Sequence, residues 1–116
     1  MEELLGTWEQ NKVAEKGRAS VMDGVARELP GLSLAEKVIK KASAIDVDVP
    51  SAHADAAATA IRALVDAPDG PDDVMVGQAL FALVARSRHA GIDPEMALRA
   101  ETKRIIAAVK ARERAG

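Results

Sequence analysis

Apolar residues recur at intervals of three and four along most of the chain, and the alternation typical of β-strands is nearly absent. This spacing, together with abundant alanine, predicts an all-α protein. The pattern predicts helical segments at about residues 3–16, 18–29, 34–45, 51–65, 74–90 and 94–114. Their number and the lengths of the connections between them predict an antiparallel helical bundle.

Capping residues mark several of the expected helix ends. At the N-termini we expect a capping box of Ser33 with Glu36, a cap from Ser51, and a cap from Asp72 or Asp73. Asp93 followed by Pro94 predicts a clean start for the last helix. The remaining boundary signals are Gly17 and Gly91 as C-terminal ends, the dipeptide Asp23-Gly24 as a turn or break, and the linkers 46–50 and 66–71.

Two of the expected helices have apolar residues that need neighbours. The helix at 74–90 is apolar nearly all round, which predicts a place in the centre of a bundle or at a subunit interface. The helix at 94–114 is expected to turn an apolar face inward. The residues concerned are Val76, Leu80, Phe81, Leu83 and Val84 in the first, and Met96, Leu98, Ile105, Ile106 and Val109 in the second. In the helix 34–45 the expected core face is Leu34, Ala35, Val38, Ala42 and Ile45.

Length and composition restrict the class of protein. A chain of 116 residues predicts a single domain, residues 1–116, with a hydrophobic core large enough to be stable without disulfide or metal cross-links. There is no cysteine, which excludes disulfides, zinc thiolate sites and thiol catalysis and suits a reducing cytoplasm. No apolar run approaches the roughly 18 residues of a membrane span, and the start MEELLGTWEQ lacks the basic region of a secretory signal. We therefore expect a cytoplasmic protein with no membrane partner.

The charge pattern argues against nucleic acid as a partner. The net charge is −2, and Trp8 and Phe81 are the only aromatic residues, too few for a base-stacking platform. Basic residues are enriched only near the C-terminus, where acids dilute them, and this pattern favours a solvated helix face over a phosphate site. Other chemistry is sparse: there is no P-loop or nucleophile elbow, and His89 at a helix C-terminus favours a structural role. Lys16-Gly17-Arg18 fits a surface turn better than an anion site.

Two stretches of the chain nevertheless carry a pattern of a known family. In the first half the matching residues are Trp8, Lys16-Gly17-Arg18-Ala19-Ser20, Asp23-Gly24, Leu29-Pro30, Ala35, Lys37, Lys40, Lys41, Ala42 and Pro50. In the second half they are Gly77, Leu80-Phe81-Ala82-Leu83-Val84, Ala85-Arg86, Arg88-His89, Gly91-Ile92-Asp93-Pro94-Glu95 and Ala97-Leu98. Together they resemble the second domain of the MazG family, over about residues 8–110.

The resemblance implies an all-α nucleoside triphosphate (NTP) pyrophosphatase fold, a homodimeric core, and magnesium-dependent cleavage of NTP to NMP and pyrophosphate. The family holds its magnesium with Glu-Glu-x-x-Glu on one helix and Glu-x-x-Asp on the next, spacings that place the carboxylates on one helix face. In this chain the matching positions are occupied by Thr59, Ala60, Ala63, Met75 and Gln78. Since none of these is acidic, we expect no metal ligand, no catalytic residue and no cofactor.

On the last helix the family also carries polar and basic residues that face the nucleotide. The matching positions here are Thr102, Arg104, Ala107 and Ala108, of which only Arg104 is charged. Arg104 and its neighbour Lys103 are therefore the candidates for phosphate contact, although Lys103 points elsewhere on a helix.

Three functions follow as hypotheses. The first is a catalytically silent MazG-like homodimer with an assembly, regulatory or nucleotide-sensing role, for which an NTP is the candidate ligand. The second is an active magnesium-dependent NTP pyrophosphohydrolase that uses relocated or partner-supplied acids. The third is a helical protein-interaction module without a link to nucleotides.

Overall fold

The structure is a computed structural model that describes residues 19–116, and these contain helices and no strand. The prediction of an all-α protein is confirmed. The elements are the 3-10 helix η1 (Val21–Gly24), α2 (Gly31–Ala44), the 3-10 helix η2 (Pro50–Ala52), α3 (Ala56–Val65), α4 (Asp73–His89) and α5 (Pro94–Ala115). The helix expected at 3–16, with Trp8, and the residues Lys16, Gly17 and Arg18 lie outside the described residues.

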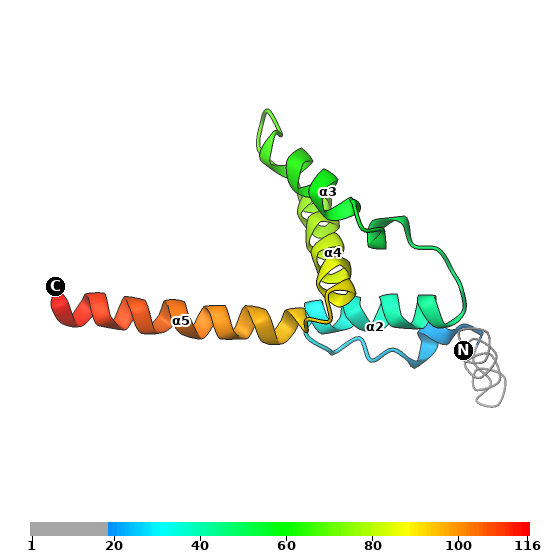
Figure 1. Cartoon of the computed structure of the whole chain (residues 1–116), viewed down its shortest axis with the longest axis horizontal. Coiled ribbons are helices and arrows are strands. Elements are labelled where there is room, and N and C mark those ends of the chain that lie inside the picture. Colours follow the sequence, from blue (N-terminus) through cyan, green and yellow to red (C-terminus); the bar gives the residue numbers. More distant parts are fainter. Residues whose placement is uncertain (1–18) are drawn as a thin grey trace.

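Helices α3 and α4 form an antiparallel hairpin, and α2 crosses the C-terminal end of α4 (Figure 1). Buried alanines line the hairpin: Ala57 on α3, and Ala79 and Ala82 on α4. Their small side chains let the two backbones approach closely. The largest fully buried side chain is Val84, which forms a small core with Ile39 and Ala85, surrounded by Leu32, Ala35, Ala52 and Phe81.

The two predicted helix N-caps that use an aspartate are confirmed. Asp72 accepts a hydrogen bond from the Met75 amide at 2.9 Å, and Asp93 accepts one from the Met96 amide at 3.2 Å. Pro94 is buried in the first turn of α5. Gly91, with φ of +74°, closes α4 in the left-handed region that a residue without a Cβ adopts freely.

Three predicted boundaries are wrong. The segment expected as a helix at 18–29 forms only the short η1, because Ser20 and Asp23 cap each other's backbone and Val25 is extended. The capping box at Ser33 fails because α2 already begins at Gly31, with the Leu34 amide bonded to the Pro30 carbonyl at 2.8 Å. Ser51 does not cap α3, since it lies in η2 and α3 begins later, at Ala56.

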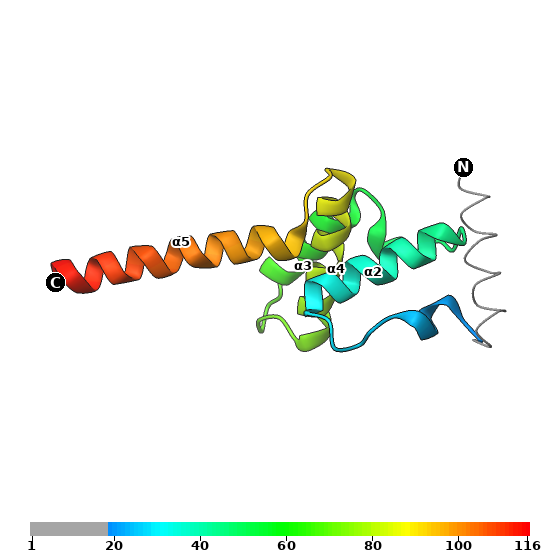
Figure 2. The same cartoon turned by 90° about the horizontal axis from the view of Figure 1, so that it is seen from below.

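The predicted burial also needs correction on two helices. On α2 the predicted burial of Ala42 is confirmed, but Ile39, which was not predicted, is also buried. Leu34 and Val38 on α2, and Ile45 just after its end, are only half-buried. Helix α5 leads away from the other helices in both views (Figures 1 and 2). Its apolar residues therefore do not face inward within a single chain: Met96, Leu98, Ile105, Ile106 and Val109 are all exposed.

Candidate functional site

The hairpin of α3 and α4 carries the five positions that match the metal ligands of the MazG pattern. Thr59, Ala60 and Ala63 lie in α3, and Met75 and Gln78 lie in the first half of α4. Ala60 and Met75 are half-buried, while the other three side chains are exposed. The two helices pack against each other, so the fold supplies the scaffold on which such a ligand set would be displayed.

The side chains on this scaffold do not fit a magnesium ion. Among the five, only the Thr59 hydroxyl and the Gln78 amide offer an oxygen, and both are neutral. The Thr59 hydroxyl already donates to the Asp55 carbonyl at 3.3 Å. Magnesium in proteins is held by one or more carboxylates with water or phosphate, because it gives up its hydration shell reluctantly. No catalytic step through a metal at these positions can therefore be derived.

The acids nearest to the hairpin serve other purposes or stand apart. Asp72 is committed to capping α4, and Asp73 lies in the first turn, where its charge favours the helix dipole. Asp55, Asp66 and Asp69 are exposed. Within residues 19–116, no three His, Asp or Glu side chains converge in a way that would hold a metal ion.

The two phosphate-contact candidates, Arg104 and Lys103, lie on α5. The Arg104 guanidinium binds both carboxylate oxygens of Glu101, through Nε at 3.0 Å and through Nη2. This bond raises the pKa of Arg104 above its usual value. Lys103 points away from that pair and lines a shallow groove with Glu95, Leu98, Arg99 and Thr102. Since α5 leads away from the hairpin (Figure 1), a single chain does not bring these cations to Thr59 or Gln78.

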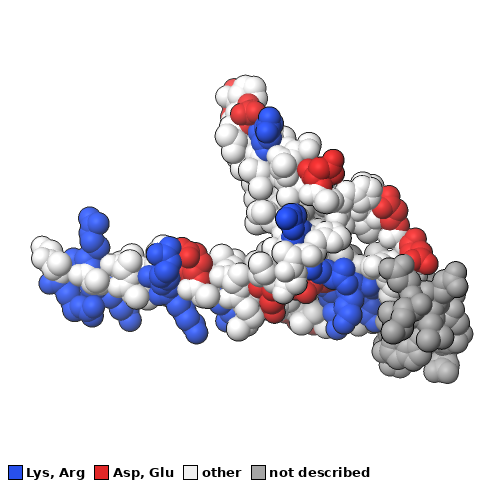
Figure 3. Space-filling view, viewed as in Figure 1, with Lys and Arg blue, Asp and Glu red and all other residues white. Residues whose placement is uncertain are grey.

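Basic side chains do gather on α5 toward the C-terminus (Figure 3). They are Arg99, Lys103, Arg104, Lys110, Arg112 and Arg114. The ion pairs of Arg99 with Glu95 and of Arg104 with Glu101 stay within the helix. These pairs resemble those of an ordinary solvated helix face.

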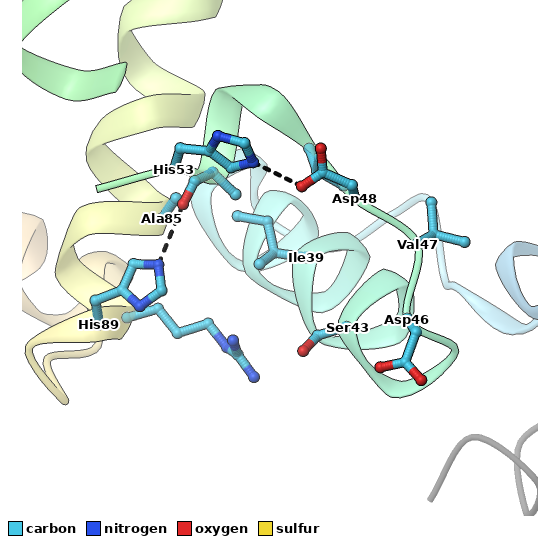
Figure 4. Close-up of a pocket in the computed structure, with 11 residues that line it drawn as sticks. Ile39, Ser43, Asp46, Val47, Asp48, His53, Ala85 and His89 are labelled. Carbon is cyan, nitrogen blue, oxygen red and sulfur yellow. Dashed lines mark hydrogen bonds and ion pairs between the residues drawn. The ribbon is translucent and has the colours of Figure 1, made fainter. Parts of the chain in front are cut away.

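The structure brings together a second group of polar side chains that the sequence analysis did not single out. A pocket of about 340 Å³ lies between the C-terminal half of α2, the 46–53 segment and the end of α4 (Figure 4). His53 Nε2 lies 2.6 Å from Asp48 Oδ1, and His89 Nε2 donates to the Ala52 carbonyl at 3.1 Å. Arg88, Asp46 and Ser43 also line the pocket, over a floor of Ile39 and Ala85.

The two histidines of this pocket differ in role. His89 ties the end of α4 to η2, 37 residues apart in sequence, which confirms the structural role expected of it. His53 is exposed, and its hydrogen bond to Asp48, followed by the charge of Asp48, raises its pKa above 6.5. The only local signal for this pair was the spacing of five residues between Asp48, in the expected linker 46–50, and His53, in the first turn of the helix expected at 51–65.

Comparison with known proteins identifies the scaffold. The chain is 30% identical over 111 residues to the nucleoside triphosphate pyrophosphohydrolase/pyrophosphatase MazG of Thermotoga maritima, and the match covers 91% of this chain. This match supports membership of the MazG family. It spans 44% of the length of that relative, less than half.

Other comparisons add nothing to this assignment. No family model matches the chain, and no solved structure matches it. Among the described residues of this MazG-family chain, no helix is long and apolar enough to span a membrane. The chain is thus a homologue of an NTP pyrophosphohydrolase, and its described residues have an all-α fold.

Proposed function

We propose that this MazG-family chain is a catalytically silent homologue that acts in assembly, regulation or nucleotide sensing. The observation that carries the proposal is the side-chain chemistry of the hairpin: two neutral oxygens, at Thr59 and Gln78, stand where the family supplies five carboxylates. A triphosphate carries about four negative charges, and without a metal none of these five side chains offsets the charge that develops as water attacks.

The direct test is a magnesium-dependent assay of pyrophosphate release. The full chain is incubated with each of the common NTPs and deoxy-NTPs, with an active MazG enzyme as positive control. We expect release at the rate of the buffer alone. Release that rises with chain concentration and stops with a chelator would establish the alternative, an active enzyme that recruits Asp66, Asp69, Asp72 and Asp73 or acids from a partner.

Nucleotide sensing and pure protein interaction are separated by a binding measurement. A ligand that binds only the folded chain stabilises it by RT ln(1 + L/Kd), where L is the free ligand concentration, so the melting temperature rises with that concentration. If the chain senses NTPs, a saturable shift should appear with a triphosphate and weaken in the Arg104→Ala variant. If no triphosphate changes the melting temperature, the protein-interaction module is favoured. The exposed apolar residues of α5 support that function too.

Homodimerisation is part of the same proposal. Helix α4 exposes Val76, Leu80 and Leu83 to 39%, 48% and 41% in the single chain, although Ala79, Ala82, Val84 and Ala85 on the same helix are buried. Burial of such residues against a second copy would stabilise a dimer by about 25 cal/mol for each Å² removed from water. Sedimentation at micromolar concentration tests this, and a stable monomer would contradict it.

A further inference from the structure

Helix α5 carries an apolar seam that nothing covers in the described part of the chain. Leu98, Ile105 and Val109, with Thr102 between them, follow one another at intervals of four, three and four, which places them on one line along the helix. The three apolar side chains are 53%, 47% and 52% exposed. The Thr102 hydroxyl donates to the Leu98 carbonyl at 2.8 Å, so it brings no unpaired donor into the seam.

A groove of about 310 Å³ lies on this seam. It is lined by Glu95, Leu98, Arg99, Thr102 and Lys103. The first four are the residues that surround the socket for one side chain of a facing helix in a coiled coil, where each apolar knob inserts between four residues of its neighbour. The shape of α5 therefore suits a second helix, and the socket centred on Leu98 suits an aliphatic side chain.

We propose that the partner of this seam is α5 of a second copy, packed antiparallel. In the register that pairs core positions, Val109 of the second copy enters the socket at Leu98, and Ile105 of the second copy faces Thr102. The same register sets Arg112 of the second copy opposite Glu95. Because the arrangement is two-fold symmetric, each of these contacts occurs twice.

The charges along α5 decide the direction of pairing. In the antiparallel register, opposite charges meet at two places: Glu95 faces Arg112, and Arg99, beside the seam, faces Glu113. In a parallel pair the core positions face their own copies, which would bring Glu95 against Glu95 and Arg112 against Arg112. The antiparallel arrangement turns these repulsions into attractions.

This inference rests on the proposed homodimer and not on nucleotide binding. The chain has no cysteine, so cross-linking can map the seam in the full-length protein. Leu98→Cys and Val109→Cys chains are prepared separately, mixed and oxidised. We expect a disulfide between a Leu98→Cys chain and a Val109→Cys chain. Two copies of the same variant should not cross-link, since identical positions would lie about 16 Å apart along the antiparallel pair. Ala100→Cys, on the opposite side of α5, is the control and should remain monomeric on a non-reducing gel.

The outcomes separate the seam from the dimer. Cross-linking of each variant with itself would establish a parallel pair and overturn the proposal. If sedimentation shows a dimer but positions 98 and 109 do not cross-link, the α5 seam is not the dimer interface. The exposed face of α4 would then be the candidate interface. A monomer would overturn both.

A charge exchange tests the register without cysteine. Arg99→Glu should weaken the dimer about tenfold, because it sets like charges against Glu113 of the second copy and removes the pair with Glu95. Adding Glu113→Arg restores only the contact between copies. Recovery of most of the lost affinity in the double variant supports the antiparallel register. A double variant as weak as the single one contradicts it.

Discussion

At the scale of single residues, the fold depends on very few large side chains. Within residues 19–116, Val84, Ile39 and Ala85 make the core, and the other buried positions are mostly alanines. Alanines allow close helix packing but remove little apolar area from water each. The free energy of unfolding of a single chain should therefore be concentrated in this one cluster.

Replacing Ile39, which is 5% exposed, should reveal that concentration. Ile39→Ala should cost about 2–5 kcal/mol, since it removes buried methylene and methyl groups and leaves a cavity against Val84. Val65→Ala, at a side chain that is 72% exposed, is the matched control and should change stability by less than about 0.5 kcal/mol. Urea unfolding monitored by circular dichroism measures both. Equal effects would show that the core lies elsewhere.

The pair of His53 and Asp48 predicts a dependence of stability on pH. Its hydrogen bond raises the pKa of His53 in the folded chain above the unfolded value of 6.5. The pair therefore stabilises the fold fully below pH 6.5, and that contribution is lost as pH rises through the folded pKa. Asp48→Asn should bring the His53 pKa down toward 6.5 in an NMR titration, whereas Asp46→Asn, in the same pocket, should leave it near the parent value. An unchanged titration in Asp48→Asn would refute the pairing.

At the scale of elements, the helix ends show which signals are local. Asp72 and Asp93 were predictable as caps because an aspartate caps a helix with atoms three residues away. Ser33 and Ser51 failed because each follows a proline, Pro30 or Pro50, which fixes the backbone and starts a helical turn before the serine. Which of two nearby residues begins the helix depends on the segments that pack against it. A short window of sequence does not include those segments.

Gly77, inside α4, and Gly91, just after its end, should respond to the same substitution with opposite signs. Gly91 closes the helix with φ of +74°, so Gly91→Ala should destabilise the fold by about 1–2 kcal/mol. Gly77 lies inside α4, and no atom comes within 4 Å of the position of an added Cβ. Gly77→Ala should therefore stabilise it by about 0.5–1 kcal/mol. Thermal melts of the two variants check the prediction. The same sign in both would mean that α4 ends or begins elsewhere.

At the scale of the whole molecule, the sequence predicted the all-α class of the fold, but not where the helices lie relative to one another. The carboxylates absent from Thr59, Ala60 and Met75 could be read directly, since spacing along a helix fixes a shared face. The outward course of α5 could not be predicted, because an apolar stripe such as Leu98 and Val109 does not reveal whether its own chain or another one covers it. The pocket around His53 and His89 likewise depends on contacts between distant segments.

Restoring the missing acids tests the assignment of the hairpin as a MazG scaffold. The variant carries Thr59→Glu, Ala60→Glu, Ala63→Glu, Met75→Glu and Gln78→Asp. Without metal, five added carboxylates on one hairpin should repel one another and lower the melting temperature. Millimolar magnesium should reverse that loss, because an ion that binds only the folded state stabilises it by mass action.

The parent chain is the control for this variant, and it should show almost no change in melting temperature with magnesium. Calcium, which is larger and accepts looser geometry, distinguishes a shaped site from general charge screening. Screening would make sodium at equal ionic strength as effective as magnesium. Turnover in the variant should stay low even if magnesium binds, because Ala107 and Ala108 leave the triphosphate without its basic contacts. If the parent and the variant respond to magnesium identically, the alignment of α3 and α4 with the two family motifs is wrong.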